Sequence, residues 1–275
     1  MKIKSFLLIL LVLMSFAVMA QRETKFLPIV QERTGNPSPF LYSETTLTSQ
    51  DQPWSVNYLS SYGERVEGQF GYDGVEQYFS VKGYFANNYT LLARASFGFG
   101  NGGEEMVSAQ QVEVLRDIVK KENLIGFRLG LGLGVGMDYA NTKLLLSRIV
   151  LSLKELKWST TGNIFFEKAL ASDRDAIDVI MSGGIHYQFS RSFLGGIEAV
   201  CEDVEGFWDE NEAEGGAKLF IGPTLNYSPF KSRLSFSLSG GPVIYATSNQ
   251  NMSAAVRELP TENGLTVRAK ITYNL

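Results

Sequence analysis

One histidine and two nearby serines are the residues whose types suit nucleophilic chemistry. His186 is the only histidine, and Ser182 and Ser190 lie four residues to either side of it. A catalytic serine must lie within hydrogen-bond distance of its histidine. Four residues of an extended strand span about 13 Å, so a partner serine would have to come from a neighbouring strand. A lone histidine on a polar strand face more often hydrogen-bonds to its neighbours, so we expect no catalytic residue and no enzyme.

Charged residues form a second group, whose chemistry is the selection of ions or polar solutes. They recur on the polar side of alternating runs, which would face the inside of a closed barrel. Glu198 and Lys218 fall on adjacent predicted strands, as do Arg128 and Arg148, and would form a selectivity zone of mixed charge. Alternatively, these charges neutralise one another in a nearly closed interior, or the N-terminal segment packs against them. The lumen-lining candidates are Arg94, Arg128, Arg148, Asp178, His186, Glu198, Lys218, Arg233 and Arg268; Glu67, Glu76, Lys82, Asp138, Glu202 and Lys270 are expected on the same side.

The acidic run 202–214 is the strongest candidate for a metal site, because carboxylates are hard oxygen ligands for divalent cations. Its spacing is not that of an EF-hand, and Phe207 and Trp208 favour a solvated loop anchored at a membrane edge. The sequence has no phosphate-binding glycine loop and no cluster of metal-binding cysteines and histidines. We therefore expect no cofactor and no metal. The net charge of −4 gives no electrostatic reason to expect nucleic acid as a partner.

The elements that would position the charged residues are strands, and the alternation is clearest in the run 125–139. Its odd-numbered residues are apolar, and its even-numbered residues are small or polar. The run contains the roughly 9 to 11 residues that a tilted strand needs to cross a membrane. The five glycines on its polar side leave room along one wall, either for a solute or for an inserted segment.

Alternation and turn residues divide the rest of the chain into twelve predicted strands. The segment 103–121 is ambiguous because it also has helix formers and a helical stripe; counting it as a strand gives the even number typical of membrane barrels. The fold class is therefore all-β, a transmembrane antiparallel up-and-down β-barrel with long outer loops and short periplasmic turns. The expected strands are 64–72, 75–85, 89–99, 103–121, 125–139, 145–153, 158–170, 177–189, 193–203, 215–227, 233–244 and 264–275.

Three regions follow from this division. Residues 1–20 have the charged start, apolar core and small-residue cleavage site of a secretion signal, with cleavage expected after Ala20. Residues 21–63 are polar and interrupted by prolines, and either line the barrel lumen or form a loose periplasmic tail. Residues 64–275 form the barrel. The single cysteine, Cys201, can form no internal disulfide, which argues against a disulfide-stapled exported domain.

The signal, the alternating strands and a closing strand with Tyr273 near the C-terminus resemble a Gram-negative outer-membrane β-barrel protein. The stretches 195–198 and 215–223 are also faintly similar to the transporter family of the phenol-degradation meta-pathway. The resemblance implies the cell outer membrane, lipids including lipopolysaccharide as partners, and the barrel assembly machinery as a partner of the C-terminal strand. The function it implies is a passive channel or transporter-like protein for a small solute. The alternatives are a non-conducting structural or surface-binding barrel and, third, a lipid-modifying enzyme.

Overall fold

The computed structural model describes residues 38–47, 54–85, 88–100, 106–122, 126–155, 157–171, 177–202, 218–229, 232–245 and 263–275. All of them belong to one compact unit, residues 33–275. The expected signal segment 1–20 and the acidic loop 204–214 lie outside the described residues, and so does the first part of the N-terminal segment.

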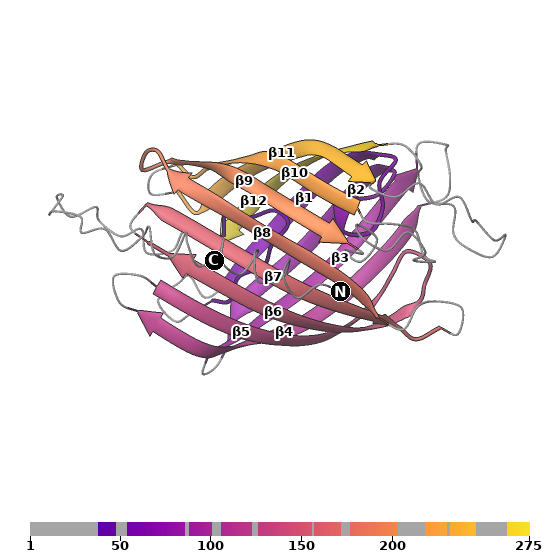
Figure 1. The fold of residues 1–275 in the computed structure, drawn as a ribbon, viewed down its shortest axis with the longest axis horizontal. Coiled ribbons are helices and arrows are strands. Elements are labelled where there is room, and N and C mark those ends of the chain that lie inside the picture. Colours follow the sequence, from indigo (N-terminus) through magenta and orange to yellow (C-terminus); the bar gives the residue numbers. More distant parts are fainter. Residues whose placement is uncertain are drawn as a thin grey trace, which may run out of the picture. The chain divides into compact units, whose positions relative to one another are not determined.

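In the described part of the chain, twelve strands form a closed antiparallel barrel (Figure 1). Each strand pairs with its neighbours in sequence, and β1 pairs with β12 to close the ring. The predicted fold class is confirmed. The strands are β1 (Trp54–Glu64), β2 (Gly74–Tyr84), β3 (Tyr89–Gly100), β4 (Val107–Glu122), β5 (Gly126–Met137), β6 (Lys143–Lys154), β7 (Trp158–Ala169), β8 (Asp178–Gln188), β9 (Phe193–Glu202), β10 (Lys218–Tyr227), β11 (Leu234–Tyr245) and β12 (Gly264–Asn274).

The barrel is apolar outside and polar inside, which is the reverse of a soluble protein. Period-two alternation produces this arrangement, because successive side chains of a strand point to opposite faces. In β12 the exposed residues are Leu265, Val267, Ile271 and Tyr273, and the buried ones are Thr266, Arg268, Thr272 and Asn274. Closure also leaves the sheet without free edges, so the outside is suited to hydrocarbon.

Strand β4 resolves the ambiguity of the segment 103–121 in favour of a strand. It pairs with β3 on one side and with β5 on the other, with a register shift between Asp117 and Val119. Glu113 and Leu115 are fully buried on the inner face, whereas Val112 and Ile118 are exposed outside. The two paired neighbours override the local helix propensity of the sequence.

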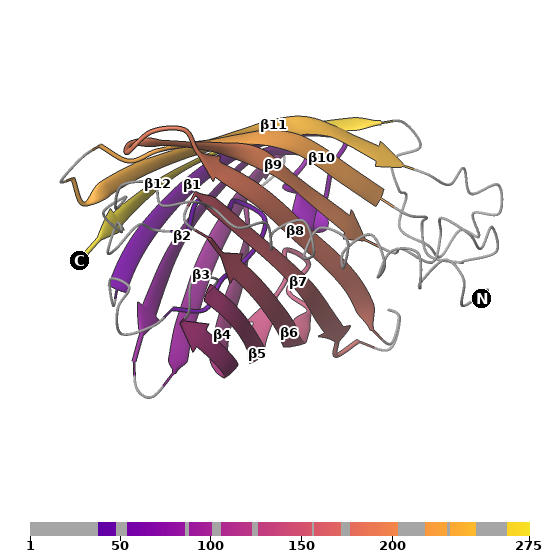
Figure 2. The same cartoon turned by 60° about the vertical axis from the view of Figure 1, so that its left-hand side comes forward.

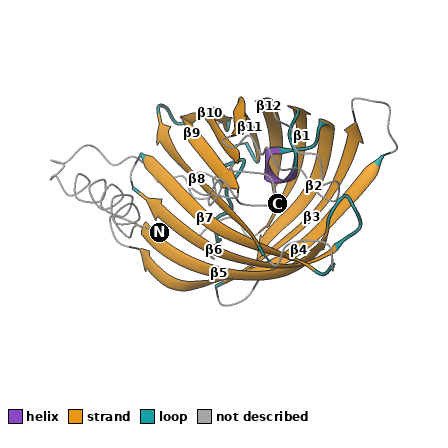
Figure 3. Ribbon diagram, turned by 45° about the vertical axis from the view of Figure 1, so that its right-hand side comes forward, coloured by secondary structure: helices purple, strands orange, loops and turns teal. Residues whose placement is uncertain are grey.

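The first predicted strand, 64–72, is wrong. Strand β1 instead spans Trp54–Glu64, so the barrel begins within the segment expected to be N-terminal to it. Residues 65–73 leave the wall and fold back through a short 3₁₀ turn, Gly68–Phe70, with positive φ at Gly68 and Gly71. Figure 3 shows this turn in purple inside the ring of strands. None of the helices in the described residues is long and apolar enough to cross a membrane.

Figure 2 shows the strands running side by side from one end of the barrel to the other. The numbers of residues that connect them differ between the two ends. At one end the connections are 85–88, 123–125, 155–157, 189–192 and 228–233, and the chain enters β1 and leaves β12 there. At the other end they are 65–73, 101–106, 138–142, 170–177, 203–217 and 246–263. This matches the expected short-turn and long-loop asymmetry.

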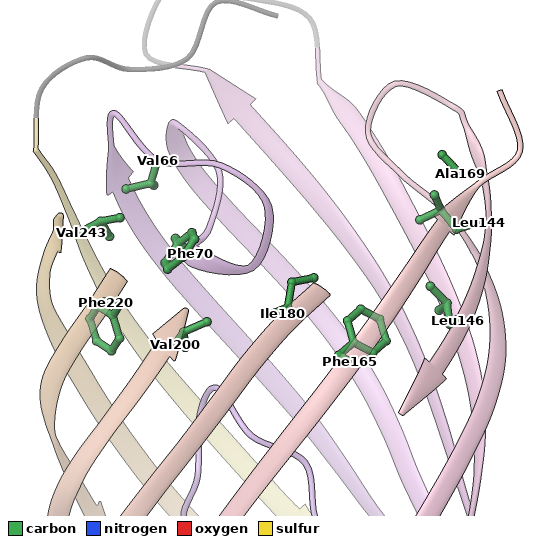
Figure 4. Packing of buried hydrophobic residues seen from close by; sticks show 10 residues of the cluster. All are labelled: Val66, Phe70, Leu144, Leu146, Phe165, Ala169, Ile180, Val200, Phe220 and Val243. Atoms are coloured by element: carbon green, nitrogen blue, oxygen red, sulfur yellow. The ribbon is translucent and has the colours of Figure 1, made fainter. Parts of the chain in front are cut away.

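An apolar cluster lies inside the barrel at the long-connection end (Figure 4). Its centre is Phe70, which is completely buried and comes from the fold-back 65–73. The backbone of this fold-back is held to β12, because Thr266 donates a hydrogen bond to the Phe70 carbonyl and Arg268 to the Gln69 carbonyl. The fold-back therefore narrows the lumen at this end. The cluster consists of Val66, Phe70, Leu144, Leu146, Phe165, Ala169, Ile180, Val200, Phe220 and Val243.

Candidate functional site

The candidate site is the polar lumen together with residues 38–47, here called the lumen segment, which lie inside it (the indigo loop within the barrel in Figure 1). The lumen segment forms neither helix nor strand. Its backbone is bound by side chains of the wall: Leu41 and Tyr42 N–H donate to the Glu198 carboxylate at 3.0 and 2.8 Å. Leu47 N–H donates to Thr90 Oγ1 at 2.8 Å. Of the two alternatives for the N-terminal segment, this part occupies the lumen.

Glu44 makes the strongest electrostatic contacts of the lumen segment. Its carboxylate accepts from Lys82 Nζ on β2 at 2.9 Å and from Arg94 Nη2 on β3 at 3.1 Å. Burial alone would raise the pKa of Glu44, but Lys82 and Arg94 outweigh it and lower the pKa to about 2. The carboxylate is therefore ionised at neutral pH and neutralises part of the charge of the two wall cations.

Asn163 on β7 binds both backbone polar groups of Glu44. Glu44 N–H donates to Asn163 Oδ1 at 2.8 Å, and Asn163 Nδ2 donates to the Glu44 carbonyl at 2.9 Å. Thr161 Oγ1 also donates to this carbonyl at 3.3 Å. Because an amide both donates and accepts, a single wall side chain satisfies both backbone groups of the residue that carries the carboxylate.

Aromatic contacts hold the N-terminal half of the lumen segment. The Phe40 ring stacks on His186 with centroids 4.6 Å apart, and the Tyr42 ring packs against Phe220 at 4.4 Å. The Arg268 guanidinium lies 4.2 Å over the Tyr42 ring. His186 is thus buried beneath Phe40 inside the barrel, and it does not face the hydrocarbon side on which a lipid-modifying site would have to open.

Two further cations bind the ends of the lumen segment through its carbonyl groups. Lys270 Nζ donates to the Phe40 carbonyl at 2.5 Å and to the Ser38 carbonyl at 3.4 Å. Arg128 Nη1 donates to the Thr46 carbonyl at 3.2 Å. The carbonyl groups carry no net charge, so these contacts do not neutralise the positive charges of Lys270 and Arg128.

The glycine-rich wall of β5 gives the lumen segment part of its space. A Cβ atom at Gly130 would lie 2.6 Å from Thr46 Cγ2, closer than two carbon atoms can approach. Gly184 on β8 is similar, since its Cβ would lie 3.0 Å from the Phe40 ring. The inserted segment therefore occupies the space at Gly130, whereas residues of β4 and β6 occupy the space at Gly132, Gly134 and Gly136.

The structure places most of the lumen-lining candidates on the inner face. Glu198 and Lys218, which were expected to act together, bind other residues. Lys218 pairs with Glu67 at 3.1 Å and with Glu202 at 3.8 Å, whereas Glu198 binds the lumen segment. The inward candidates are Arg94, Arg128, Arg148, Asp178, His186, Glu198, Lys218 and Arg268. Arg233 is the exception: it lies exposed in the turn before β11, because that strand begins at Leu234. Whether a solute contacts any of them stays a prediction.

Arg128 and Arg148 lie on the paired strands β5 and β6, as expected, and Arg148 binds Glu113 on β4. Its Nε and Nη2 donate to the two Glu113 oxygens at 2.9 and 2.8 Å, and both side chains are buried. Glu113 was missed as a lumen residue because the register of β4 was not fixed by the sequence. Asp117 lies four residues further on and therefore on the same face of the strand. The recurrence of a carboxylate at this spacing is the sequence signal that identifies the inner face.

Neither Ser182 on β8 nor Ser190 in the turn after it forms a hydrolase site with His186. Ser182 accepts a hydrogen bond from Ser43 of the lumen segment at 3.0 Å. Neither His186 ring nitrogen has a hydrogen-bond partner among the described residues. The described part of the chain also has no group of three or more histidine, cysteine or acidic residues that could hold a metal ion.

The fold and the site together define a closed twelve-stranded antiparallel barrel with part of its own chain inside the lumen. Solved structures with the same fold include the KdgM porin in complex with disordered oligogalacturonate, which is 13% identical with a TM-score of 0.54; the match covers 80% of this chain and 99% of that one. The NanC porin is 9% identical with a TM-score of 0.55, and the match covers 80% and 100%. At these identities the likeness shows the fold. The sequence matches no family model and no curated protein.

Proposed function

We propose that this protein is an outer-membrane β-barrel channel for small polar solutes, and that the docked lumen segment occludes its passage. The apolar outer face of the closed barrel supports insertion into a membrane. The observation that carries the channel function is the nature of the wall around the lumen segment. It binds a piece of backbone through hydrogen bonds and ion pairs, with groups such as Glu198 and Asn163 that water or a polar solute can equally satisfy.

The same proposal includes export and partners. The segment 1–20 acts as a signal that is cleaved after Ala20, the outer face contacts outer-membrane lipids including lipopolysaccharide, and the last strand is recognised by the barrel assembly machinery. The KdgM porin structure is a complex with oligogalacturonate, which supports a barrel of this fold accepting a solute. Membership of the transporter family of the phenol-degradation meta-pathway remains a prediction.

Planar-bilayer recording tests the channel function. Protein refolded in detergent and inserted into a bilayer is expected to open in brief, discrete conductance steps, because the lumen segment must leave its contacts before ions pass. A folded barrel that shows no steps under any condition, including after replacement of the lumen segment, would contradict the proposal.

A second candidate function is a non-conducting structural or surface-binding barrel. The occupation of the lumen by residues 38–47 and by the fold-back 65–73 favours it. The two candidates differ in one measurable property: a permanently filled barrel stays closed when the contacts of the lumen segment are removed. We further propose that the protein is not an enzyme, so His186→Ala is expected to leave lipid turnover in the outer membrane unchanged.

A further inference from the structure

The two cations that bind Glu44 belong to the barrel wall, whereas the carboxylate does not. Lys82 lies on β2 and Arg94 on the paired strand β3. The Arg94 guanidinium is also held 4.6 Å over the ring of Tyr78, a residue of the wall. The strands, and not the lumen segment, therefore fix the positions of both cations.

We propose that Lys82 and Arg94 form a carboxylate-binding site in the lumen, which Glu44 fills when the lumen segment is docked and a small polar carboxylate solute fills when the segment is displaced. The geometry is that of a carboxylate site, because Lys82 binds one oxygen and Arg94 the other, at 2.9 and 3.1 Å. The inference rests on the proposed channel function and adds the class of solute to it.

The charge of the wall around the lumen segment favours an anion. Among the described wall residues that hydrogen-bond to the segment, Lys82, Arg94, Arg128 and Lys270 are cationic, and Glu198 is a carboxylate. Removal of the segment takes Glu44 away and leaves all these wall charges in place. A local excess of fixed cations in the space that the segment leaves concentrates anions there and disfavours cations.

Two other carboxylates lie within electrostatic range of Arg94, namely Glu76 and Glu113. Each is bound by a partner of its own: Tyr139 donates to Glu76 at 2.8 Å, and Arg148 holds Glu113 through two hydrogen bonds. They moderate the positive potential, but they do not take the place of Glu44 between the two cations.

The groups beside the carboxylate position define the rest of the solute. Asn163 binds both the N–H and the carbonyl of Glu44, and Thr161 binds the same carbonyl. Once the segment has left, these side chains present donors and acceptors a few bonds away from the carboxylate position. A solute that carries hydroxyl groups as well as a carboxylate satisfies both parts of the site, so gluconate is a suitable probe and sorbitol is its uncharged counterpart.

The main experiment uses a full-length variant in which residues 38–47 are replaced by ten glycine and serine residues, which preserves the length of the chain. In planar bilayers under a KCl gradient, this variant is expected to conduct and to prefer chloride over potassium. Gluconate is expected to reduce the chloride current in a concentration-dependent manner, and sorbitol at the same concentrations is not.

Substitution of the two cations then tests the site itself. On the same background, Lys82→Gln together with Arg94→Gln is expected to weaken the gluconate block at least 10-fold, since two charge-assisted hydrogen bonds are lost. The matched control is Lys218→Gln, which removes a lumen cation that pairs with Glu67 and Glu202. This control is expected to change the block less than 3-fold.

The results of these recordings distinguish failure of the carboxylate site from failure of the channel function. A folded replacement variant that never conducts overturns the channel function. A variant that conducts without anion preference, or whose gluconate block is equally sensitive to Lys218→Gln, overturns the carboxylate site and leaves the channel in place.

A second variant covers the case in which the replacement prevents folding. Glu44→Gln in the intact chain removes both ion pairs and keeps the size of the side chain, so channel openings are expected to become more frequent. The control Glu76→Gln removes a lumen carboxylate bound by Ser61 and Tyr139, neither of which belongs to the lumen segment. Equal opening frequencies in wild type, Glu44→Gln and Glu76→Gln would overturn the inference.

Discussion

The occlusion of the lumen should weaken in acid, because Glu44 holds the lumen segment as a carboxylate. The pKa of Glu44 is lowered from 4.5 to about 2 in the docked state, where Lys82 and Arg94 outweigh the effect of burial. Because docking lowers the pKa of this group, the ionised carboxylate stabilises the docked state at pH values above the pKa of the undocked carboxyl group. This stabilisation is therefore complete above about pH 4.5 and is lost progressively as the pH falls towards 2.

The magnitude follows from the size of the shift. A change of one pKa unit corresponds to about 1.4 kcal/mol, so the shift from 4.5 to about 2 corresponds to roughly 3 kcal/mol of docking free energy at neutral pH. The carboxylate is partly exposed, so this figure is an upper estimate. Complete loss of the contacts between the Glu44 carboxylate and the two cations lowers the docking equilibrium constant by a factor of up to roughly 100.

The assay is the frequency of channel openings in planar bilayers at pH 7, 4.5 and 3. For the wild type we expect this frequency to be constant between pH 7 and 5 and to rise by up to about 30-fold at pH 3, which lies about 1.5 pKa units below the undocked value. Glu44→Gln is expected to show a raised frequency already at pH 7 and a smaller rise in acid.

Other titratable groups face the lumen segment and share the acid response. Glu198 binds the N–H groups of Leu41 and Tyr42, and its protonation also weakens docking. Glu76 and Glu113 are the other carboxylates in electrostatic contact with Arg94. The contribution of Glu44 is therefore the difference between wild type and Glu44→Gln. Identical pH profiles for the two proteins would refute the reasoning.

Three further predictions concern the wall. Gly130→Val places a side chain where the lumen segment lies, since a Cβ alone comes within 2.6 Å of Thr46, so channel openings should become more frequent in bilayer recordings. Glu113→Ala leaves the buried Arg148 charge unpaired and should lower the free energy of unfolding by about 3 to 5 kcal/mol in urea titrations of the folded protein in lipid vesicles. Leu133→Arg puts a charge on the outer face, where Leu133 is 72% exposed, and should destabilise the barrel by about 2 to 4 kcal/mol in lipid vesicles but by less in detergent.

Each of these predictions has a matched control. Gly162→Val lies on the outer face of β7, where a Cβ would lie 3.9 Å from the Ser182 carbonyl oxygen, so unchanged openings are expected. Glu113→Ala combined with Arg148→Ala should cost less than the sum of the single substitutions, because neither charge is then left unpaired. Ser147→Arg is a positive control for the outer face: Ser147 lies directly opposite Leu133 in the pairing of β5 with β6, so this substitution should destabilise the barrel like Leu133→Arg. Equal effects of Gly130→Val and Gly162→Val would contradict the placement of the lumen segment.

The strands from β2 to β12 could be predicted from the sequence because hydrocarbon outside and polar groups inside impose an alternation over much of their length, which the inward apolar residues at the long-connection end interrupt. Strand β1 breaks that alternation in its centre, where Leu59 points inward and is buried, and Ser60 takes the outward position. Leu59 packs against Leu41 of the lumen segment and against Tyr78. Its inward position thus depends on a partner that only the folded chain supplies, and the pattern of β1 alone does not indicate a membrane strand.

The wall of the site was predictable for the same reason, whereas its occupant was predicted only as one of two alternatives for residues 21–63. Alternation placed Lys82 and Arg94 on the inner face, since each lies in a regular strand. Glu44 belongs to a polar segment without periodicity, so no pattern in the sequence relates it to cations that lie 38 and 50 residues further along the chain. Contacts across a barrel lumen depend on the closed geometry, which local sequence does not encode.

The most direct test of occlusion by the lumen segment is a reversible crosslink. The hydroxyl oxygens of Ser43 and Ser182 are 3.0 Å apart, so cysteines at both positions, in a Cys201→Ser background, bring their sulfur atoms within bonding distance. Oxidised protein inserted into a bilayer should stay closed, and addition of a reductant to the same membrane should start channel openings, which the Ser43→Cys single variant shows throughout. Full conductance of the oxidised protein, or closure that persists after reduction, would contradict the account.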